Sequence, residues 1–514
     1  MYSQYYNKIE NQKKIFEMLL SRMQSEQNSN KKLLIAQRAL FYAGYNNTGY
    51  FTSSVLEDFF VNYAKSLKSD IAGIFCKKNS FLHVVTAGYT TGGHTRVVER
   101  WIENAPEIQS HSVVFIQPNE HRLSKLIKNV NDKKGKVIYF KNTWSLEDKA
   151  LKLRKLAMNF EYVILHVHIE DPVPVIAFGT TEFKRPVIFY NHASHMFWIG
   201  KSVADLVLDI KENDEVTKIY RNIKNSFFLG VPSLDMKFNF FDKNEYRKKL
   251  GLPLDKNIII TSGHSRKYVT IGNDSFADIL TQIIDENTYC YVIGVDKNEP
   301  EWEKLRQETN GHVILLGYID FNNGFLDYIR SADLCLDSYP LGGGAALMDA
   351  IASSVPVLSL KSVYPQFDYL IQTPAYCSTR TEFIDKVKKV LSDKDYAKNL
   401  LKELQISLLK YQSKNAWNEK IKNMLEIIPA THSVKDLSSE KDFCEANDLS
   451  VLDNVIVKNN FFTQPVKTDI VKEADDIIKH WVKYKNTYNF LLKIFGPIFL
   501  FAIKICKKVN QCKS

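Results

Sequence analysis

Apolar residues fall into short uninterrupted runs along the middle of the chain, and amphipathic stretches separate these runs. Val- and Ile-rich runs without polar alternation are typical of strands in parallel sheets covered by helices on both faces. The first series occupies residues 82–87, 112–116, 136–140, 162–166, 186–190 and 206–209. A second series occupies residues 257–261, 289–294, 312–316, 333–337 and 355–359. The pattern predicts two α/β domains in tandem.

Helical periodicity dominates both ends of this central region. Apolar spacing near 3.6 predicts helices over residues 8–23, 31–43 and 54–67, and again over 382–391 and 397–425. Two Rossmann-like domains in tandem, with a ligand cleft between them, form the architecture called GT-B. The predicted organisation is a helical N-terminal segment (1–70), a first Rossmann-like domain (71–235), a polar linker (236–256), a second Rossmann-like domain (257–428) and a C-terminal extension (429–514).

Composition narrows the class of protein only slightly. The 514 residues are 45% hydrophobic and 25% charged, with a net charge of +10, which is typical of a multidomain globular protein. Lys and Arg are spread along the chain rather than gathered in one basic tract, so we expect no nucleic-acid partner. The seven cysteines form no C-x-x-C pair, and the N-terminus lacks the apolar core of a signal peptide. We therefore expect a cytoplasmic protein without disulfides or a zinc site.

The C-terminal extension carries a basic and aromatic segment over residues 483–508. Its uninterrupted apolar core, 494–503, is too short to span a bilayer of roughly 30 Å, and Lys493 and Lys504 flank it. An interfacial helix on the inner face of an anionic membrane is one interpretation. A helix packed on the protein's own core is the alternative.

A glycine loop between a predicted strand and a predicted helix is the strongest candidate binding site. Gly342, Gly343 and Gly344 follow the buried strand 333–337 and open a helix. Glycines at such a turn let backbone N–H groups approach an anion, and the helix N-terminus adds partial positive charge. Asp349, one turn into the helix, is placed to accept hydrogen bonds from ribose hydroxyls. The layout suits a nucleoside diphosphate, although a plain structural turn would look the same.

A second candidate loop follows the first strand of the second series. Gly263, Arg266 and Lys267 come after the strand at 257–261. A cation there can stabilise a departing diphosphate, which is the role of a metal in other enzymes. The alternative is a solvated basic turn. Asp393 and Asp395 have the spacing of a metal-binding pair, but they lie between two predicted helices, so we interpret them as a helix cap and expect no metal.

Histidines gather at the predicted carboxyl ends of the first strand series. Gly92 and Gly93 allow close approach of a ligand, and His94 stands at the start of the following helix, where it could act as a general base or simply cap the helix. Strand carboxyl ends line the crevice of an open α/β sheet, so several histidines should converge there. The others that we assign to this edge are His166, His168, His192 and His195. A metal site is the weaker interpretation of this group.

These motifs resemble the catalytic region of the O-GlcNAc transferase family and its bacterial cytosolic, protein-glycosylating relatives. The similar segments are 86–101, 185–209, 262–280 and 317–358, and together they span roughly residues 82–425. The resemblance implies a glycosyltransferase, with Lys267 on the donor diphosphate, Asp349 on the ribose and His94 at the active-site opening. It also implies UDP-sugar as donor, no cofactor, an inverting reaction, a first domain on the acceptor side and a protein hydroxyl as acceptor.

Departures from the family pattern keep other functions open. The family's His-Thr-Thr at the phosphate loop is Gly344, Ala345 and Ala346 here, so phosphate contacts must come from backbone N–H groups. Tetratricopeptide repeats are absent from the sequence. A transferase acting on a lipid-linked or polysaccharide acceptor, a UDP-sugar epimerase and a catalytically silent partner subunit are the alternatives.

Overall fold

The computed structural model describes residues 2–442, apart from 69–70, 72, 90–92, 120–122, 195, 213–215, 233–237, 269–274, 321–323 and 363–365. The predicted interfacial helix at 483–508 therefore lies outside the described residues.

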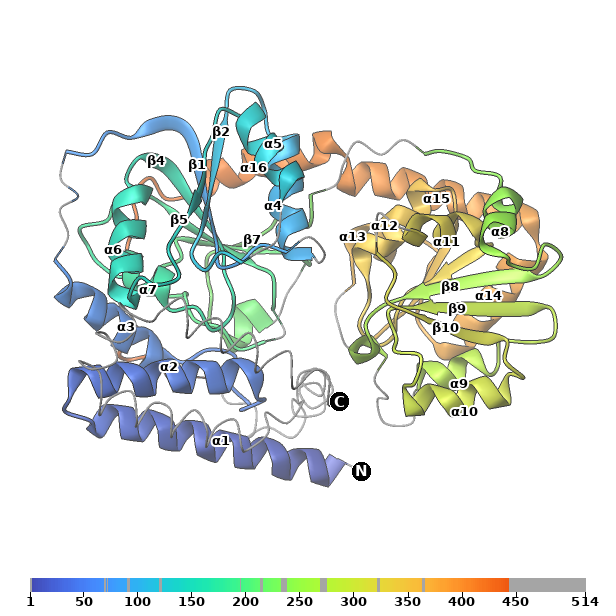
Figure 1. Ribbon diagram of the computed structural model, residues 1–514, viewed down its shortest axis with the longest axis horizontal. Coiled ribbons are helices and arrows are strands. Elements are labelled where there is room, and N and C mark those ends of the chain that lie inside the picture. The colour runs from blue at the N-terminus through green and yellow to red at the C-terminus, as the bar shows by residue number, and fades with distance from the viewer. Residues whose placement is uncertain are drawn as a thin grey trace, which may run out of the picture. The chain divides into compact units, whose positions relative to one another are not determined.

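Three helices precede the first sheet and pack on it: α1 (Tyr2–Ser25), α2 (Ser29–Tyr45) and α3 (Ser54–Ser66). Asn28 and Ser53 cap the second and third of these helices through their side chains. Apolar residues of all three helices join one hydrophobic cluster with the sheet. The three helices predicted from apolar periodicity are present, and they belong to the core of the first lobe (Figure 1).

The first lobe is built on a seven-stranded parallel sheet in the order β3-β2-β1-β4-β5-β6-β7. Its strands are β1 (Lys77–Val85), β2 (Ser110–Phe115), β3 (Val137–Tyr139), β4 (Phe160–His166), β5 (Val187–Asn191), β6 (Leu206–Asp209) and β7 (Ser226–Phe228). The helices between them are α4 (Gly93–Asn104), α5 (Ser124–Asp132), α6 (Leu146–Ala157) and α7 (Val173–Phe178), followed by a π-helical turn at Val216–Tyr220. The sheet reverses its order at β1 and β4, which is where doubly wound folds bind ligands.

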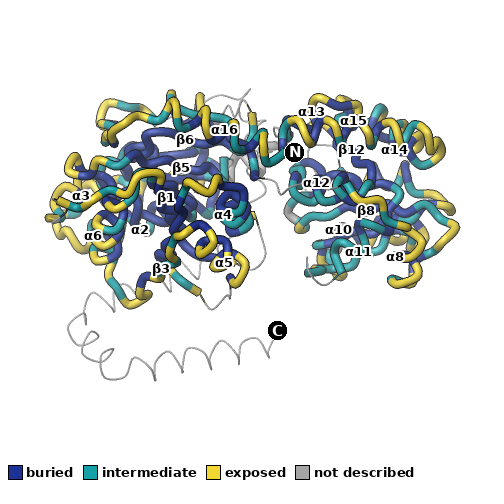
Figure 2. Tube along the Cα trace, turned by 90° about the horizontal axis from the view of Figure 1, so that it is seen from above, coloured by how far each residue is buried: buried dark blue, intermediate teal, exposed yellow. Residues whose placement is uncertain are grey.

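Both faces of this sheet are covered, and alternate strand residues point to opposite sides. Leu82 and Val84 of β1 pack in the cluster with α3, α6 and α7, whereas Phe81 packs in another cluster with α4. The tube coloured by burial shows these strands as a buried interior (Figure 2). This two-sided burial explains why the strands appear in the sequence as unbroken apolar runs.

The second lobe has a six-stranded parallel sheet in the order β10-β9-β8-β11-β12-β13. Its strands are β8 (Asn257–Ser262), β9 (Thr288–Ile293), β10 (Val313–Gly317), β11 (Leu334–Leu336), β12 (Val357–Leu360) and β13 (Tyr376–Cys377). The accompanying helices are α8 (Lys243–Leu250), α9 (Phe276–Leu280), α10 (Pro300–Glu308), α11 (Leu326–Ser331), α12 (Gly344–Ala352), α13 (Asp368–Ile371), α14 (Arg380–Ser392) and α15 (Lys394–Gln412), with a 3-10 turn at Ser265–Lys267. One hydrophobic cluster fills this lobe.

Two differences from the predicted elements bear on the second lobe. The segment predicted as a linker, 236–256, contains α8, and Arg247 on that helix bonds Asp333 at 2.6 Å in the second lobe. The single helix predicted over 397–425 is wrong: it is two helices, α15 and α16 (Lys414–Ile427). Ser413 separates them because its side chain caps α16 by accepting from the Ala416 N–H. Helix α16 packs with α4 of the first lobe through Trp417 and Trp101.

Candidate functional site

The glycine loop lies between β11 and the N-terminus of α12, as predicted. Gly342 and Gly344 are required by close packing, because an added Cβ would lie 2.5 Å from Gln366 Nε2 and 2.2 Å from Phe367 Cε2, respectively. Helix geometry leaves the first N–H groups of α12, including that of Gly344, without intrahelical partners. The loop therefore places backbone donors and the positive end of a helix at the carboxyl edge of the second sheet.

Lys267 reaches this loop from the neighbouring strand. It ends the 3-10 turn after β8, and β8 pairs with β11 in the sheet. Its Nζ donates to the Gly342 carbonyl at 3.3 Å, and a Cβ on Gly343 would lie 3.2 Å from it. Burial lowers the pKa of Lys267, and the nearby Asp337 opposes that shift. Lys267 and the glycine loop, 75 residues apart in sequence, thus form one constellation.

Asp337 is a third member of this constellation that the sequence reasoning missed. It follows β11 and is 3% exposed. Its carboxylate accepts from the Gly343 N–H at 2.7 Å, from Ser359 Oγ at 2.8 Å and from Gln366 Nε2 at 3.2 Å. Burial raises the pKa of Asp337, while the Gly343 N–H, the Ser359 hydroxyl and Lys267 oppose the shift. Because Asp337 occupies the Gly343 N–H, backbone donation to an anion is left to other groups of the loop.

The remaining donor-side predictions are placed as follows. Asp349 lies on α12, and its carboxylate is 3.9 Å from Arg96 of α4. Burial raises the pKa of Asp349, and Arg96 and Arg100 oppose this shift. Gly263 follows β8, where an added Cβ would lie 3.0 Å from the Lys267 side chain. Arg266 lies in the same turn as Lys267, but its side chain is outside the described residues, as is Gly92.

His94 and His192 lie side by side in the first lobe. Gly93 and His94 open α4, and His192 directly follows β5. Their ring centroids are 3.6 Å apart, and both side chains are partly exposed. Burial lowers the pKa of His94 to about 3 and that of His192 well below its usual value. His195 lies outside the described residues.

His166, predicted to line the same edge, contacts His192 from the buried end of β4. Its Nδ1 is 2.9 Å from His192 Nε2. His168 lies nearby, with its ring 5.8 Å from that of His94 and its Nδ1 3.7 Å from Glu170. The edge therefore holds His94, His166 and His192 as neutral imidazoles at neutral pH, which can accept a proton but carry no charge.

Other features of the described residues do not contribute to either candidate site. Asp393 caps α15 by accepting from the Asp395 and Tyr396 N–H groups, which confirms the predicted cap. Among the residues that the structure describes, no group of three or more His, Cys, Asp or Glu side chains is arranged to hold a metal ion. No helix within the same residues is long and apolar enough to cross a bilayer.

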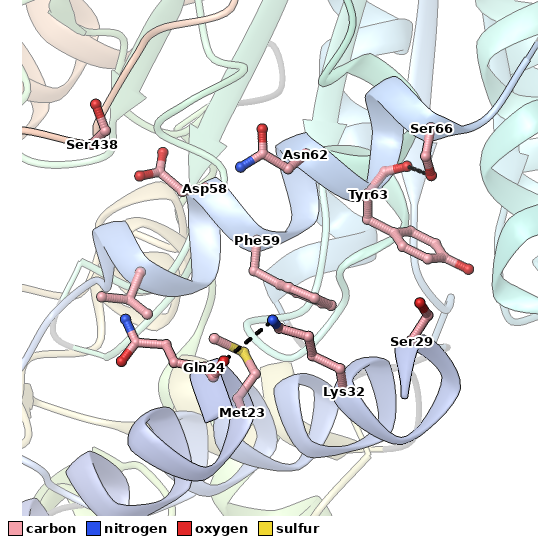
Figure 3. Close-up of a pocket in the computed structure, with 11 residues that line it drawn as sticks. Met23, Gln24, Ser29, Lys32, Asp58, Phe59, Asn62, Tyr63, Ser66 and Ser438 are labelled. Carbon is pink, nitrogen blue, oxygen red and sulfur yellow. Dashed lines mark hydrogen bonds between the residues drawn. The ribbon is translucent and has the colours of Figure 1, made fainter. Parts of the chain in front are cut away.

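A hollow of about 520 Å³ lies between α1, α2 and α3 (Figure 3). Phe59 of α3 points toward Met23 and Lys32, and Asp58 and Tyr63 also line the hollow. It contains none of the predicted site residues. The hollow is therefore a feature of the helical layer and is separate from the two constellations described above.

Comparison with known proteins finds a family similarity in the second lobe. Residues 242–405 match the model of the family described as glycosyl transferases group 1. The matched residues contain the Lys267 turn, Asp337, the glycine loop and Asp349.

A curated relative supports the same assignment. The chain is 25% identical over 194 residues to the putative teichuronic acid biosynthesis glycosyltransferase TuaC of Bacillus subtilis. The similarity covers 37% of this chain and about half, 47%, of the relative.

Solved structures share the two-lobed fold. A glycosyltransferase from Rickettsia africae aligns with a TM-score of 0.51 at 10% identity, covering 68% of this chain and 99% of the other. The structure of the Anabaena HepE protein in complex with UDP aligns with a TM-score of 0.50 at 13% identity, covering 68% of this chain and 99% of the other. A Thermobaculum terrenum O-GlcNAc transferase variant aligns with a TM-score of 0.50 at 12% identity, covering 83% of this chain and 84% of the other. These likenesses confirm the GT-B fold with its helical N-terminal region.

Proposed function

We propose that this protein is a glycosyltransferase that moves a sugar from a UDP-sugar to an acceptor hydroxyl. The observation that carries the proposal is the contact of Lys267 Nζ with the glycine loop at the start of α12, within the residues that match the group 1 family. Transfer releases a diphosphate, so negative charge develops on the oxygen that leaves the sugar. A cation and a helix N-terminus aimed at that oxygen stabilise the transition state.

The donor is held by the second lobe. Lys267 and the first N–H groups of α12 bind the diphosphate, and Gly263 lets the lysine stem approach the loop. Asp349 accepts hydrogen bonds from the ribose, for which it exchanges its interaction with Arg96. Because Lys267 supplies the positive charge at the leaving group, the reaction proceeds without a metal.

The acceptor is activated by the first lobe. His94 and His192 are unprotonated at neutral pH, since burial lowers the pKa of both imidazoles. One of them removes the acceptor proton as the new glycosidic bond forms, with inversion at the anomeric carbon. A protein Ser or Thr hydroxyl is the acceptor, as the resemblance to the O-GlcNAc transferase family implies.

A surface polysaccharide or a lipid-linked glycan is the second candidate acceptor. The name of the Bacillus subtilis relative, a putative teichuronic acid biosynthesis glycosyltransferase, supports it. The basic and aromatic segment at 483–508 fits a membrane-attached acceptor, through peripheral binding at the inner membrane face.

The test is a panel of UDP-sugars incubated with the purified full-length chain, with UDP release and thermal stability followed together. The proposal predicts that one donor stabilises the protein and is slowly hydrolysed, and that a peptide or glycan acceptor accelerates UDP release. Formation of an isomerised UDP-sugar without transfer would instead identify an epimerase. Failure of every UDP-sugar to bind would contradict the proposal and favour a silent subunit.

A further inference from the structure

A continuous chain of hydrogen-bonded histidines crosses the sheet of the first lobe. His192 Nε2 lies 2.9 Å from His166 Nδ1, and His166 Nε2 lies 3.1 Å from His83 Nδ1. His83 Nε2 lies 3.0 Å from His111 Nδ1. The chain ends where His111 Nε2 meets Gln109 Oε1 at 3.3 Å. It therefore links the carboxyl end of β5, through β4 and β1, to the amino end of β2.

The interior of this chain is sealed. His83, His111 and His166 are each 0% exposed. The Trp101 ring packs edge-on against His83 at 5.4 Å and against His166 at 6.0 Å. Burial lowers the pKa of His83 to about 3, and it lowers the pKa values of His111 and His166 well below the ordinary value of histidine. These imidazoles are therefore neutral at physiological pH.

Neutrality makes the proton positions interdependent. A neutral imidazole has one N–H donor and one bare nitrogen, and His166, His83 and His111 each use both nitrogens within the chain. If one ring carries its proton on Nε2, its neighbours must do the same. In the orientation in which Gln109 Oε1 faces His111 Nε2, the oxygen accepts, and the proton of His111 lies on Nε2. His83, His166 and His192 must then also carry their protons on Nε2, and Nδ1 of His192 is left without a proton.

We propose that this row of hydrogen-bonded histidines fixes the tautomer of His192, an arrangement that we call a tautomer lock. The lock presents the unprotonated Nδ1 of His192 to the acceptor hydroxyl as the general base. This inference rests on the proposed function for its acceptor. The acceptor O–H bond breaks, its proton moves to His192 Nδ1, its oxygen bonds the anomeric carbon, and the bond from that carbon to the diphosphate oxygen breaks. His192 is partly exposed, so it then returns its proton to water. His166, His83, His111 and Gln109 act as positioning residues.

A lock fits the packing better than a proton wire through the same atoms. Passing a proton along the chain would leave every ring protonated on Nδ1 instead of Nε2. Each imidazole would have to rotate before the next turnover. Trp101 packs on two of these rings, and Tyr190 lies 5.3 Å from His166 and 4.5 Å from His192, which prevents such rotation. The order of protons is therefore fixed at folding.

The test reverses the direction of the hydrogen bonds by substituting Gln109, the residue at the opposite end from His192. Gln109 is half-buried at the start of β2, so its substitution leaves the four rings in place. In Gln109→Lys the only hydrogen-bonding group is a donor, which requires a bare His111 Nε2 and places the proton of His192 on Nδ1. In Gln109→Glu the carboxylate is an acceptor, which retains the wild-type order. Both variants change the same residue and have side chains of comparable length, so they differ in whether the side chain donates or accepts the hydrogen bond.

Two readouts separate the lock from the proposed function. In ¹⁵N-histidine-labelled protein, ring-nitrogen shifts should show Nε2–H tautomers in the wild type and in Gln109→Glu, and Nδ1–H tautomers in Gln109→Lys. With the donor identified in the UDP-sugar panel, kcat should fall about 100-fold in Gln109→Lys at an unchanged donor KM, and stay within about threefold in Gln109→Glu. Equal kcat in the two variants, or mixed tautomers in the wild type, would overturn the lock. An inactive wild type with ordered Nε2–H tautomers would overturn the proposed function and the role of His192 as base, and retain the ordered chain.

Discussion

The two lobes place opposite kinds of polar chemistry at the edges of similar parallel sheets. The first lobe buries a row of neutral histidines that satisfy one another, with His83 bonded on both ring nitrogens. The second buries a cation and a carboxylate, Lys267 and Asp337, around a glycine loop. Buried charges need a partner of opposite sign, whereas neutral imidazoles need only complementary donors and acceptors.

This difference separates two tasks that glycosyl transfer combines. A neutral histidine can accept a proton without first losing one, so the first lobe is suited to the acceptor hydroxyl. A lysine held beside a helix N-terminus is suited to the anionic leaving group. The lobes should therefore respond to different perturbations: the first to acid, and the second to loss of one charge.

Acid should destabilise the first lobe more than any single substitution. The unfolded state binds protons on histidine below a pKa of about 6.5, whereas folded His83 and His94 have pKa values of about 3. The contribution of these histidines to the free energy of unfolding is therefore fully present above about pH 6.5 and is lost as the pH falls toward 3. At pH 5 each of the two histidines has lowered the free energy of unfolding by about 2 kcal/mol. Hydrogen exchange between pH 8 and pH 5 should show β1 and β4 losing protection before β8 and β9. A pH-independent pattern would contradict the burial of neutral histidines.

Loss of the Lys267 charge should be the largest effect on catalysis. We expect Lys267→Ala to lower kcat by about 100-fold to 1,000-fold, the size of effect seen when one transition-state donor is removed. The folded protein should keep its thermal stability to within a few degrees, because burial already disfavours the charged lysine. Lys304→Ala is the matched control, since Lys304 lies exposed on α10 beside Glu308. Turnover in Lys267→Ala equal to that of the control would refute the assignment.

Asp349→Asn should have the smallest of these effects. The amide keeps one acceptor oxygen but loses the charge that strengthens hydrogen bonds to the ribose, which corresponds to about threefold to tenfold in donor KM. The value of kcat should change less, because the ribose is remote from the bond that breaks. Steady-state kinetics over a range of donor concentration would distinguish this pattern from a loss in kcat alone, which would place Asp349 at the reacting centre instead.

Sequence patterns were sufficient for the lobes and for most strands, because two-sided burial leaves an unmistakable apolar run. They missed β7 and β13, which are edge strands of three and two residues. The break at Ser413 was also missed, since apolar periodicity continues from α15 into α16.

The site was only partly predictable for a related reason. Lys267, the glycine loop and His94 follow strand ends, where position along the chain indicates position in space. Asp337 also follows a strand, and its place between that strand and the glycine loop was the signal available. His83 lies within an apolar run and His111 just before one, and their contact depends on the register that pairs Phe81 with His111. Register between parallel strands depends on packing along the whole sheet, so sequence spacing does not reveal it.

The central claim is that the Lys267 constellation of the second lobe is a UDP site. Isothermal titration of the full-length protein with UDP, in EDTA, tests it most directly against Lys267→Ala and the Lys304→Ala control. We predict one site per chain in the wild type and in the control, with affinity at least about tenfold weaker in Lys267→Ala, since a charge-assisted contact of 1.5–3 kcal/mol is lost. Equal affinity in all three proteins, or no binding to the wild type, would contradict the account.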